Sequence, residues 1–70
     1  MTTTTFHTIT TAVHATEGRE QINRENLGYR QEDLANLGRY GYILVSTVTV
    51  PEPDGVTRLI DTLMLVEQSE

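Results

Sequence analysis

The residues best suited to bind a ligand are an arginine and two tyrosines near the middle of the chain. Arg39, Tyr40 and Tyr42 stand close together, where an expected helix gives way to a strand. A guanidinium beside tyrosine rings can stack on and clamp a flat anionic ligand such as a nucleotide. Arg58 could add a second positive charge. The alternative is structural, with Tyr42 filling a core position and Arg39 pointing into solvent.

Asp61 is the second candidate because it interrupts an otherwise apolar stretch. The expected register places it on the same face as Leu59 and Leu63, opposite Val45. A carboxylate in that position must either reach solvent at the sheet edge or be paired when buried. We expect it to pair with an arginine across a subunit interface. Contact with a ligand is the alternative.

Sequence signatures of catalysis and of metal binding are missing. There is no glycine-rich phosphate loop, nucleophile elbow or His-Glu-x-x-His pair, and neither Ser46 nor Ser69 has a histidine nearby in sequence. His7 and His14 lie on opposite faces of any regular strand, so they cannot hold one ion together. We therefore expect neither an enzyme nor a bound metal or cofactor.

The charge balance limits the classes of partner. Ten acidic and five basic residues give a net charge of −5, which argues against direct binding of nucleic acid, because that needs clustered cations. No run of about 18 apolar residues is present to span a membrane, and the chain starts without a secretion signal. We expect a cytoplasmic protein, located in the host cytoplasm if a phage encodes it.

The length of the chain points to self-association. Its 70 residues are enough for a single domain, residues 1–70. A chain this short buries only about 60% of the surface that its unfolded form exposes, and it has no cysteine to form a disulfide. Small scaffolds without such supports commonly depend on a partner subunit. We therefore expect a homo-oligomer.

The order of elements predicts an α+β fold. The expected elements are a strand at about 5–14, a polar loop at 15–26, a helix at about 27–37, a strand at about 42–50, a turn at 51–55 and a strand at about 56–66. Gly38 is expected to end the helix in the left-handed conformation. Neither face of the first strand is strongly apolar, which favours a position at the sheet edge. The result is a β-α-β-β domain, an antiparallel sheet with one helix packed on one face.

The expected hairpin is apolar on both faces. A turn centred near Pro53 places Val48 opposite Arg58, Leu44 opposite Thr62 and Tyr42 opposite Met64. One helix can cover only one face, and a large exposed apolar patch is uncommon on a monomer. We therefore expect a second subunit to bury the other face. One face holds Tyr42, Leu44, Val48, Ile60, Met64 and Val66, and the other, the expected interface, holds Ile43, Val45, Leu59, Leu63 and Leu65.

The junction between helix and strand carries a family resemblance. The segment Leu34-x-x-Leu37-Gly38-x-x-Gly41-Tyr42-x-Leu44-Val45 resembles the signature of domain-of-unknown-function family 4177, a group of small bacterial and phage proteins. The start of the last strand, residues 55–60, is also similar. The resemblance covers roughly residues 27–66, with Tyr42 in place of the usual tryptophan. It implies a compact β-α-β-β domain without an established catalytic activity.

Three functions are compatible with these observations. The first is a non-catalytic oligomeric binding module that acts through a protein surface or a pocket between subunits. The second is a phage-type accessory protein that counters host defence, by sequestering a small nucleotide signal or by inhibiting a host protein. The third is a purely structural subunit. The expected partners are another copy of the chain and, beyond that, a host protein or a small anionic ligand.

Overall fold

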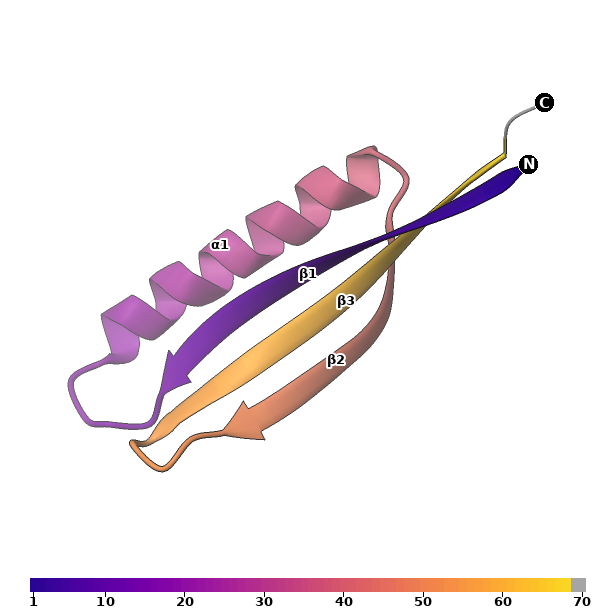
Figure 1. The fold of residues 1–70 in the computed structure, drawn as a ribbon. Coiled ribbons are helices and arrows are strands. Elements are labelled where there is room, and N and C mark those ends of the chain that lie inside the picture. The colour runs from indigo at the N-terminus through magenta and orange to yellow at the C-terminus, as the bar shows by residue number, and fades with distance from the viewer. Residues whose placement is uncertain (69–70) are drawn as a thin grey trace.

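The structure, a computed structural model that describes residues 1–68, is a three-stranded antiparallel sheet with one helix (Figure 1). Its elements are β1 (Thr2–His14), α1 (Glu20–Arg39), β2 (Ile43–Pro51) and β3 (Val56–Gln68). The strand order is β1-β3-β2, so β3 is central and both β1 and β2 are edge strands. The expected α+β fold with a β2–β3 hairpin is confirmed, as is the edge position of the first strand.

The helix is longer than the sequence pattern indicates. It begins at Glu20, within the stretch expected to be a polar loop at 15–26, and ends at Arg39. The reason is that its inward stripe is only partly apolar. The half-buried residues at helical spacing are Asn23, Asn26, Arg30, Leu34 and Leu37. Side-chain hydrogen bonds anchor the first three, so a search for an apolar period alone finds only the second half of the helix.

The end of α1 also differs from the expectation, because Gly41 rather than Gly38 adopts the left-handed conformation. Gly41 has φ 94°, whereas Gly38 has no positive φ and remains in the helix. The Tyr42 N–H donates to the Leu37 carbonyl at 3.1 Å and the Gly41 N–H donates to the Gly38 carbonyl at 3.0 Å. This pair of bonds is the Schellman arrangement, with Gly41 as the first residue past the helix cap.

The register of the hairpin differs from the expected one. Val48 lies opposite Ile60, Val50 opposite Arg58, and Ile43, not Tyr42, opposite Met64. A β-bulge between Leu44 and Ser46 adds Val45 to β2 without a partner on β3. Because a shift of one residue exchanges the two faces of a strand, the bulge moves Leu44 to the face opposite from Val48.

The helix packs on one face of the sheet and leaves the other uncovered (Figure 1). Residues directly opposite each other on neighbouring strands share a face. On the helix side, Ile9 of β1 lies opposite Asp61 of β3, and Leu63 is only 2% exposed. Leu59, Leu63 and Leu65 therefore belong to the helix side and not, as expected from the sequence, to the face that the helix leaves uncovered. Among residues 1–68, Ile9 and Leu63 are the only buried hydrophobic residues.

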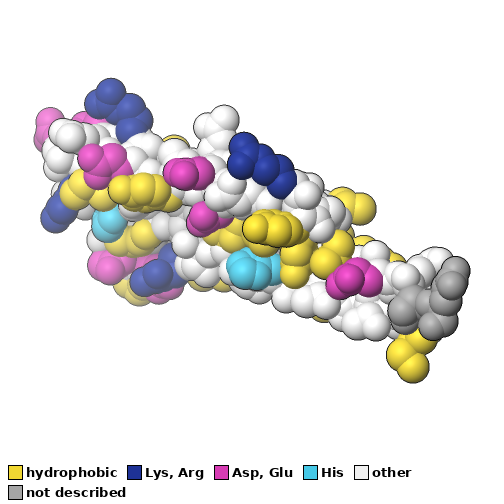
Figure 2. Space-filling model, turned by 90° about the horizontal axis from the view of Figure 1, so that it is seen from above, with side chains coloured by type: hydrophobic (Ala, Val, Ile, Leu, Met, Phe, Trp, Pro, Cys, Tyr) yellow, Lys and Arg dark blue, Asp and Glu magenta, His cyan; other side chains and the backbone are white. Residues whose placement is uncertain are grey.

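The chain is unusually extended for its length. Its radius of gyration is 14.8 Å and its principal extents are 54 × 22 × 10 Å. A compact domain of this length has a radius of gyration of about 11 Å. Figure 2 shows the elongated body, which tapers toward the end where β1 starts. Within the described residues, no helix is long and apolar enough to cross a membrane.

Candidate functional site

The centre of the helix side of the sheet is a buried polar cluster around Asp61. Arg30 of α1 donates two hydrogen bonds to this carboxylate, from Nε to Oδ2 at 2.7 Å and from Nη2 to Oδ1 at 2.9 Å. The Thr47 hydroxyl of β2 donates a third, to Oδ1 at 2.7 Å. The Asp61 side chain is fully buried, whereas that of Arg30 is 25% exposed. One carboxylate thus joins α1, β2 and β3.

The cluster explains the ionisation of its members. The two hydrogen bonds from Arg30 lower the pKa of Asp61, and the bond from Thr47 lowers it further, against the opposing effect of burial. The same bonds raise the pKa of Arg30. Asp61 is therefore a paired anion whose accepting oxygens are already used within one chain. The expected arginine partner exists, but it is Arg30 of the same chain and not an arginine across an interface.

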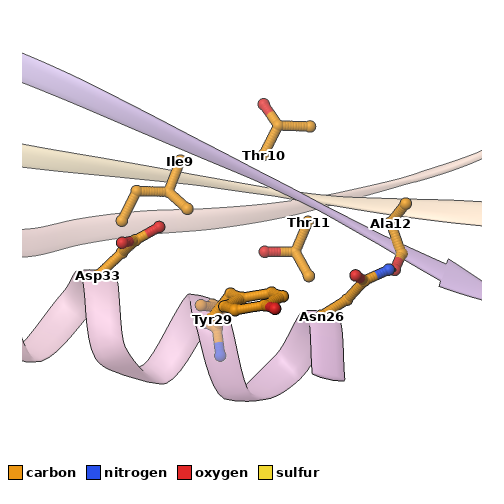
Figure 3. A pocket seen from close by; sticks show the side chains of 8 residues that line it. Ile9, Thr10, Thr11, Ala12, Asn26, Tyr29 and Asp33 are labelled. Carbon is orange, nitrogen blue, oxygen red and sulfur yellow. The ribbon is translucent and has the colours of Figure 1, made fainter. Parts of the chain in front are cut away.

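A groove runs between α1 and the free edge of β1. It consists of two adjoining hollows of about 280 Å³ and 380 Å³, which share Ile9, Thr10 and Asp33. Figure 3 shows Asn26, Tyr29 and Asp33 reaching up from the helix, while Ile9 and Thr11 point down from the strand. The groove is lined by hydroxyl, amide and carboxylate groups together with the apolar side chains of Ile9, Ala12 and Leu37.

Two asparagines of α1 close the end of this edge. The His14 N–H donates to Asn23 Oδ1 at 2.7 Å, and Asn23 Nδ2 donates to the His14 carbonyl at 2.7 Å. Asn26 Nδ2 donates to the Ala12 carbonyl at 3.0 Å. A carboxamide that both accepts from and donates to one residue reproduces the bonds that a neighbouring strand would make. The last residues of β1 are thus satisfied by the helix.

The uncovered face of the sheet carries large apolar side chains among polar ones, which include Thr8, Thr62 and Ser46 across its middle. Its large hydrophobic side chains come from all three strands, and several are strongly exposed, including Phe6 at 62%, Ile43 at 63% and Val48 at 52%. We call this surface the open face. Its apolar residues are Phe6, Ile43, Val48, Val50, Ile60, Met64 and Val66.

The residues expected to clamp a ligand are not brought together. Arg39 ends α1 and donates to Asn36 Oδ1 at 3.2 Å, and the neighbouring Tyr40 is 77% exposed. Arg58 lies near the hairpin turn and pairs with Glu52 at 3.2 Å. It is opposite Val50, seven residues along β2 from Ile43, so the two arginines are on the order of 20 Å apart along the strand. They cannot hold one small ligand within a single chain.

Tyr42 has a packing role. It is half-buried, and its ring meets that of His7 edge to face, with 6.1 Å between centroids. Two other expected interface residues are exposed, Ile43 on the open face and Val45 in the bulge, at 63% and 47%. Over residues 1–68, no group of three histidine or acidic side chains is placed to hold a metal ion.

The polar partners of the helix were not found from the sequence. Asn23, Asn26 and Arg30 are spaced three and four residues apart and continue into Leu34 and Leu37. Read as one stripe regardless of polarity, this spacing indicates the inward face of a long helix.

Comparison with protein-family models, curated proteins and solved structures finds no match. The resemblance to family 4177 stays a prediction.

Proposed function

We propose that this protein is a non-catalytic, homo-oligomeric binding module in which the open face of one subunit is covered by the open face of a second copy. The observation that carries the proposal is the set of large apolar side chains exposed on that face. Monomeric soluble proteins rarely expose apolar patches of more than a few hundred Å². Here Phe6, Ile43, Val48 and Val66 are each at least 47% exposed on one surface.

The exposed area of the chain supports an assembled state. Its solvent-accessible surface is 5221 Å², whereas a compact monomer of this mass exposes about 4,400 Å². The excess, about 800 Å², equals the area that each partner contributes to a standard-sized interface. The core, with two buried hydrophobic residues among residues 1–68, is also too small to stabilise an isolated domain without help.

The chemistry of the open face favours the same face of a second copy as its partner. The open face presents β-branched and aromatic side chains with Arg58 as its charged residue on β3, so it offers little for a charged partner to recognise. Two twisted sheets stack face to face with strands about 30° apart, and their side chains interdigitate. Closed symmetric assemblies of this kind are the usual form of soluble homo-oligomers.

Light scattering behind a sizing column tests the proposal. The wild-type chain should elute as an oligomer at micromolar concentration, and Val48→Asp should lower the subunit number because it places a charge in the contact. Thr49→Asp is the matched control, since Thr49 is the exposed neighbour on the opposite face of β2. A wild-type monomer, or equal behaviour of the two variants, would contradict the proposal.

Native mass spectrometry of the same sample addresses the ligand. An oligomer that retains no small molecule supports a module that acts through protein surfaces. A retained nucleotide that is lost in Arg39→Ala or Arg58→Ala would instead favour the sequestration hypothesis. Within an oligomer these two arginines would have to come from different subunits, because one chain keeps them apart.

A further inference from the structure

The outward-facing backbone groups of β1 can be assigned from the hydrogen bonds at its end. The Ala15 N–H donates to the Gly55 carbonyl at 2.8 Å, which continues the ladder to β3. The backbone groups of His14 and Ala12 turn the other way, because they bond to Asn23 and Asn26 of the helix. In an antiparallel pair these two kinds of residue alternate. The even-numbered residues of β1 therefore direct their N–H and C=O groups to the free edge.

Only part of that edge is closed. Asn23 and Asn26 occupy it at His14 and Ala12. Upstream, no hydrogen bond within residues 1–68 reaches the outward groups of Thr4, Phe6, Thr8 and Thr10. The open stretch thus runs from Thr2 to Thr10, and the groove beside α1 lies along its second half.

The two edge strands differ in their protection against pairing. Proteins commonly protect an edge with a bulge, a proline or a lysine. Strand β2 has the bulge at Val45 and ends at Pro51. Strand β1 has neither, carries no Asp, Glu, Lys or Arg, and is 13 residues long. A long, unprotected edge is a surface onto which another strand adds.

The open stretch is self-complementary. Its residues on the open face read Thr2, Thr4, Phe6, Thr8 and Thr10, a pattern that is the same in both directions about Phe6. We infer that β1 pairs with β1 of a second copy, antiparallel, about a two-fold axis at Phe6. Thr4 then lies opposite Thr8 of the partner subunit and Thr2 opposite Thr10 of the partner subunit. Threonine pairs and an aromatic pair are favourable across strands.

The position of the asparagines sets this register. With the two-fold axis at Phe6, every outward-facing backbone group from Thr2 to Thr10 has a partner on the second strand. The pairing ends next to Ala12, whose carbonyl is bonded to Asn26. The first residues of the partner strand then lie beside Thr8 and Thr10, in the groove lined by Tyr29 and Asp33. The pairing joins two three-stranded sheets into one, with both helices on the same side. The open faces become continuous and remain free to stack.

This inference rests on the proposed self-association but concerns a different surface, so the two can fail separately. Hydrogen exchange resolved by residue tests it on the wild-type chain. The amides of Phe6 and Thr8 should exchange at least about tenfold more slowly than that of Ala12, whose N–H also faces outward but lies beyond the pairing. The amides of His7 and Ile9, bonded to β3, are slow in either case. An oligomer with fast Phe6 and Thr8 amides overturns the edge pairing alone, and a monomer overturns both proposals.

A proline pair provides the second measurement. Thr8→Pro removes an outward N–H without touching the ladder to β3, a substitution that edge strands tolerate. It should reduce the subunit number, whereas Ala12→Pro should not. In the Val48→Asp background, Thr8→Pro should yield the monomer and Ala12→Pro the edge-paired dimer. Equal subunit numbers for the two proline variants would overturn the inference, and if Thr8→Pro does not fold, the exchange rates of the wild-type chain decide.

Discussion

Arg30 and Asp61 form a two-pronged ion pair that ties the helix to the central strand, with N···O distances of 2.7 and 2.9 Å. The strand that carries Asp61 is flanked by β1 and β2, and Thr47 of β2 also bonds to the carboxylate. The pair therefore lies between the helix and the sheet, at the point where α1, β2 and β3 are joined. In a fold with two buried hydrophobic residues among those described, it specifies where the helix sits on the sheet.

Asp61→Asn should be strongly destabilising. It leaves the half-buried Arg30 without its anionic partner beside the fully buried position 61, and breaking a buried pair costs about 3 kcal/mol. Arg58→Ala is the matched control, because Arg58 and Glu52 form an exposed pair worth no more than about 1 kcal/mol. Urea unfolding followed by circular dichroism measures both. Similar free energies of unfolding for the two variants would contradict the structural role of the cluster.

The contribution of Asp61 should depend on pH in a defined direction. Its pKa in the folded state is lower than the ordinary value of 3.8, chiefly because Arg30 donates to it. A lowered folded-state pKa gives stability that is fully present above the unfolded pKa and is lost as pH falls through the folded pKa. The difference in unfolding free energy between wild type and Asp61→Asn should therefore be constant near neutrality and shrink below about pH 4. A difference that grows in acid would refute this.

Removing the two asparagines should affect both stability and assembly. Asn23→Ala with Asn26→Ala removes three hydrogen bonds to β1, at roughly 1 kcal/mol each. It also extends the open edge to His14, so we expect higher-mass species to form by further strand pairing. Thermal unfolding and light scattering report the two effects. Gln31→Ala, an exposed amide on the same helix, should change neither.

Two glycines should respond to alanine in opposite ways. Gly41 has φ 94°, and a Cβ there would lie 3.3 Å from Leu65 Cδ1. Gly41→Ala should therefore destabilise by about 1–2 kcal/mol. Gly28 is inside α1, with nothing within 4 Å of an added Cβ, and Gly28→Ala should stabilise by about 0.5–1 kcal/mol. Chemical denaturation distinguishes them, and a stabilised Gly41→Ala would show that the helix ends differently.

The order of elements and the hairpin could be read from the sequence because both depend on local patterns. The β-branched runs and the Pro-Glu-Pro-Asp-Gly turn at residues 51–55 need no tertiary information. The first half of the helix could not be read in that way, since Asn23, Asn26 and Arg30 are anchored by partners on β1 and β3 that are distant in sequence. The bulge at Val45 was missed for a similar reason, because pairing with β3 decides it.

The candidate site, too, could be predicted from the sequence only in part. The sequence indicated that Asp61 must be paired if it is buried, because an unpaired buried carboxylate is costly, and it left exposure at the sheet edge as the other possibility. Which arginine pairs with it depended on a contact between α1 and β3. The ligand clamp expected from Arg39 and Arg58 was not assembled, because their positions at the two ends of β2 follow from the register.

The sequence by itself determined the α+β class, the order of strands and helix along the chain, and the excess of apolar residues over what one helix can cover. Local propensity and pattern suffice for these properties, since each depends on neighbouring residues. The tertiary structure decided which face stays open, which backbone groups of β1 remain unpaired, and where Asn23 and Asn26 close that edge. These properties depend on register and on contacts between distant segments, and a shift of one residue would reverse them.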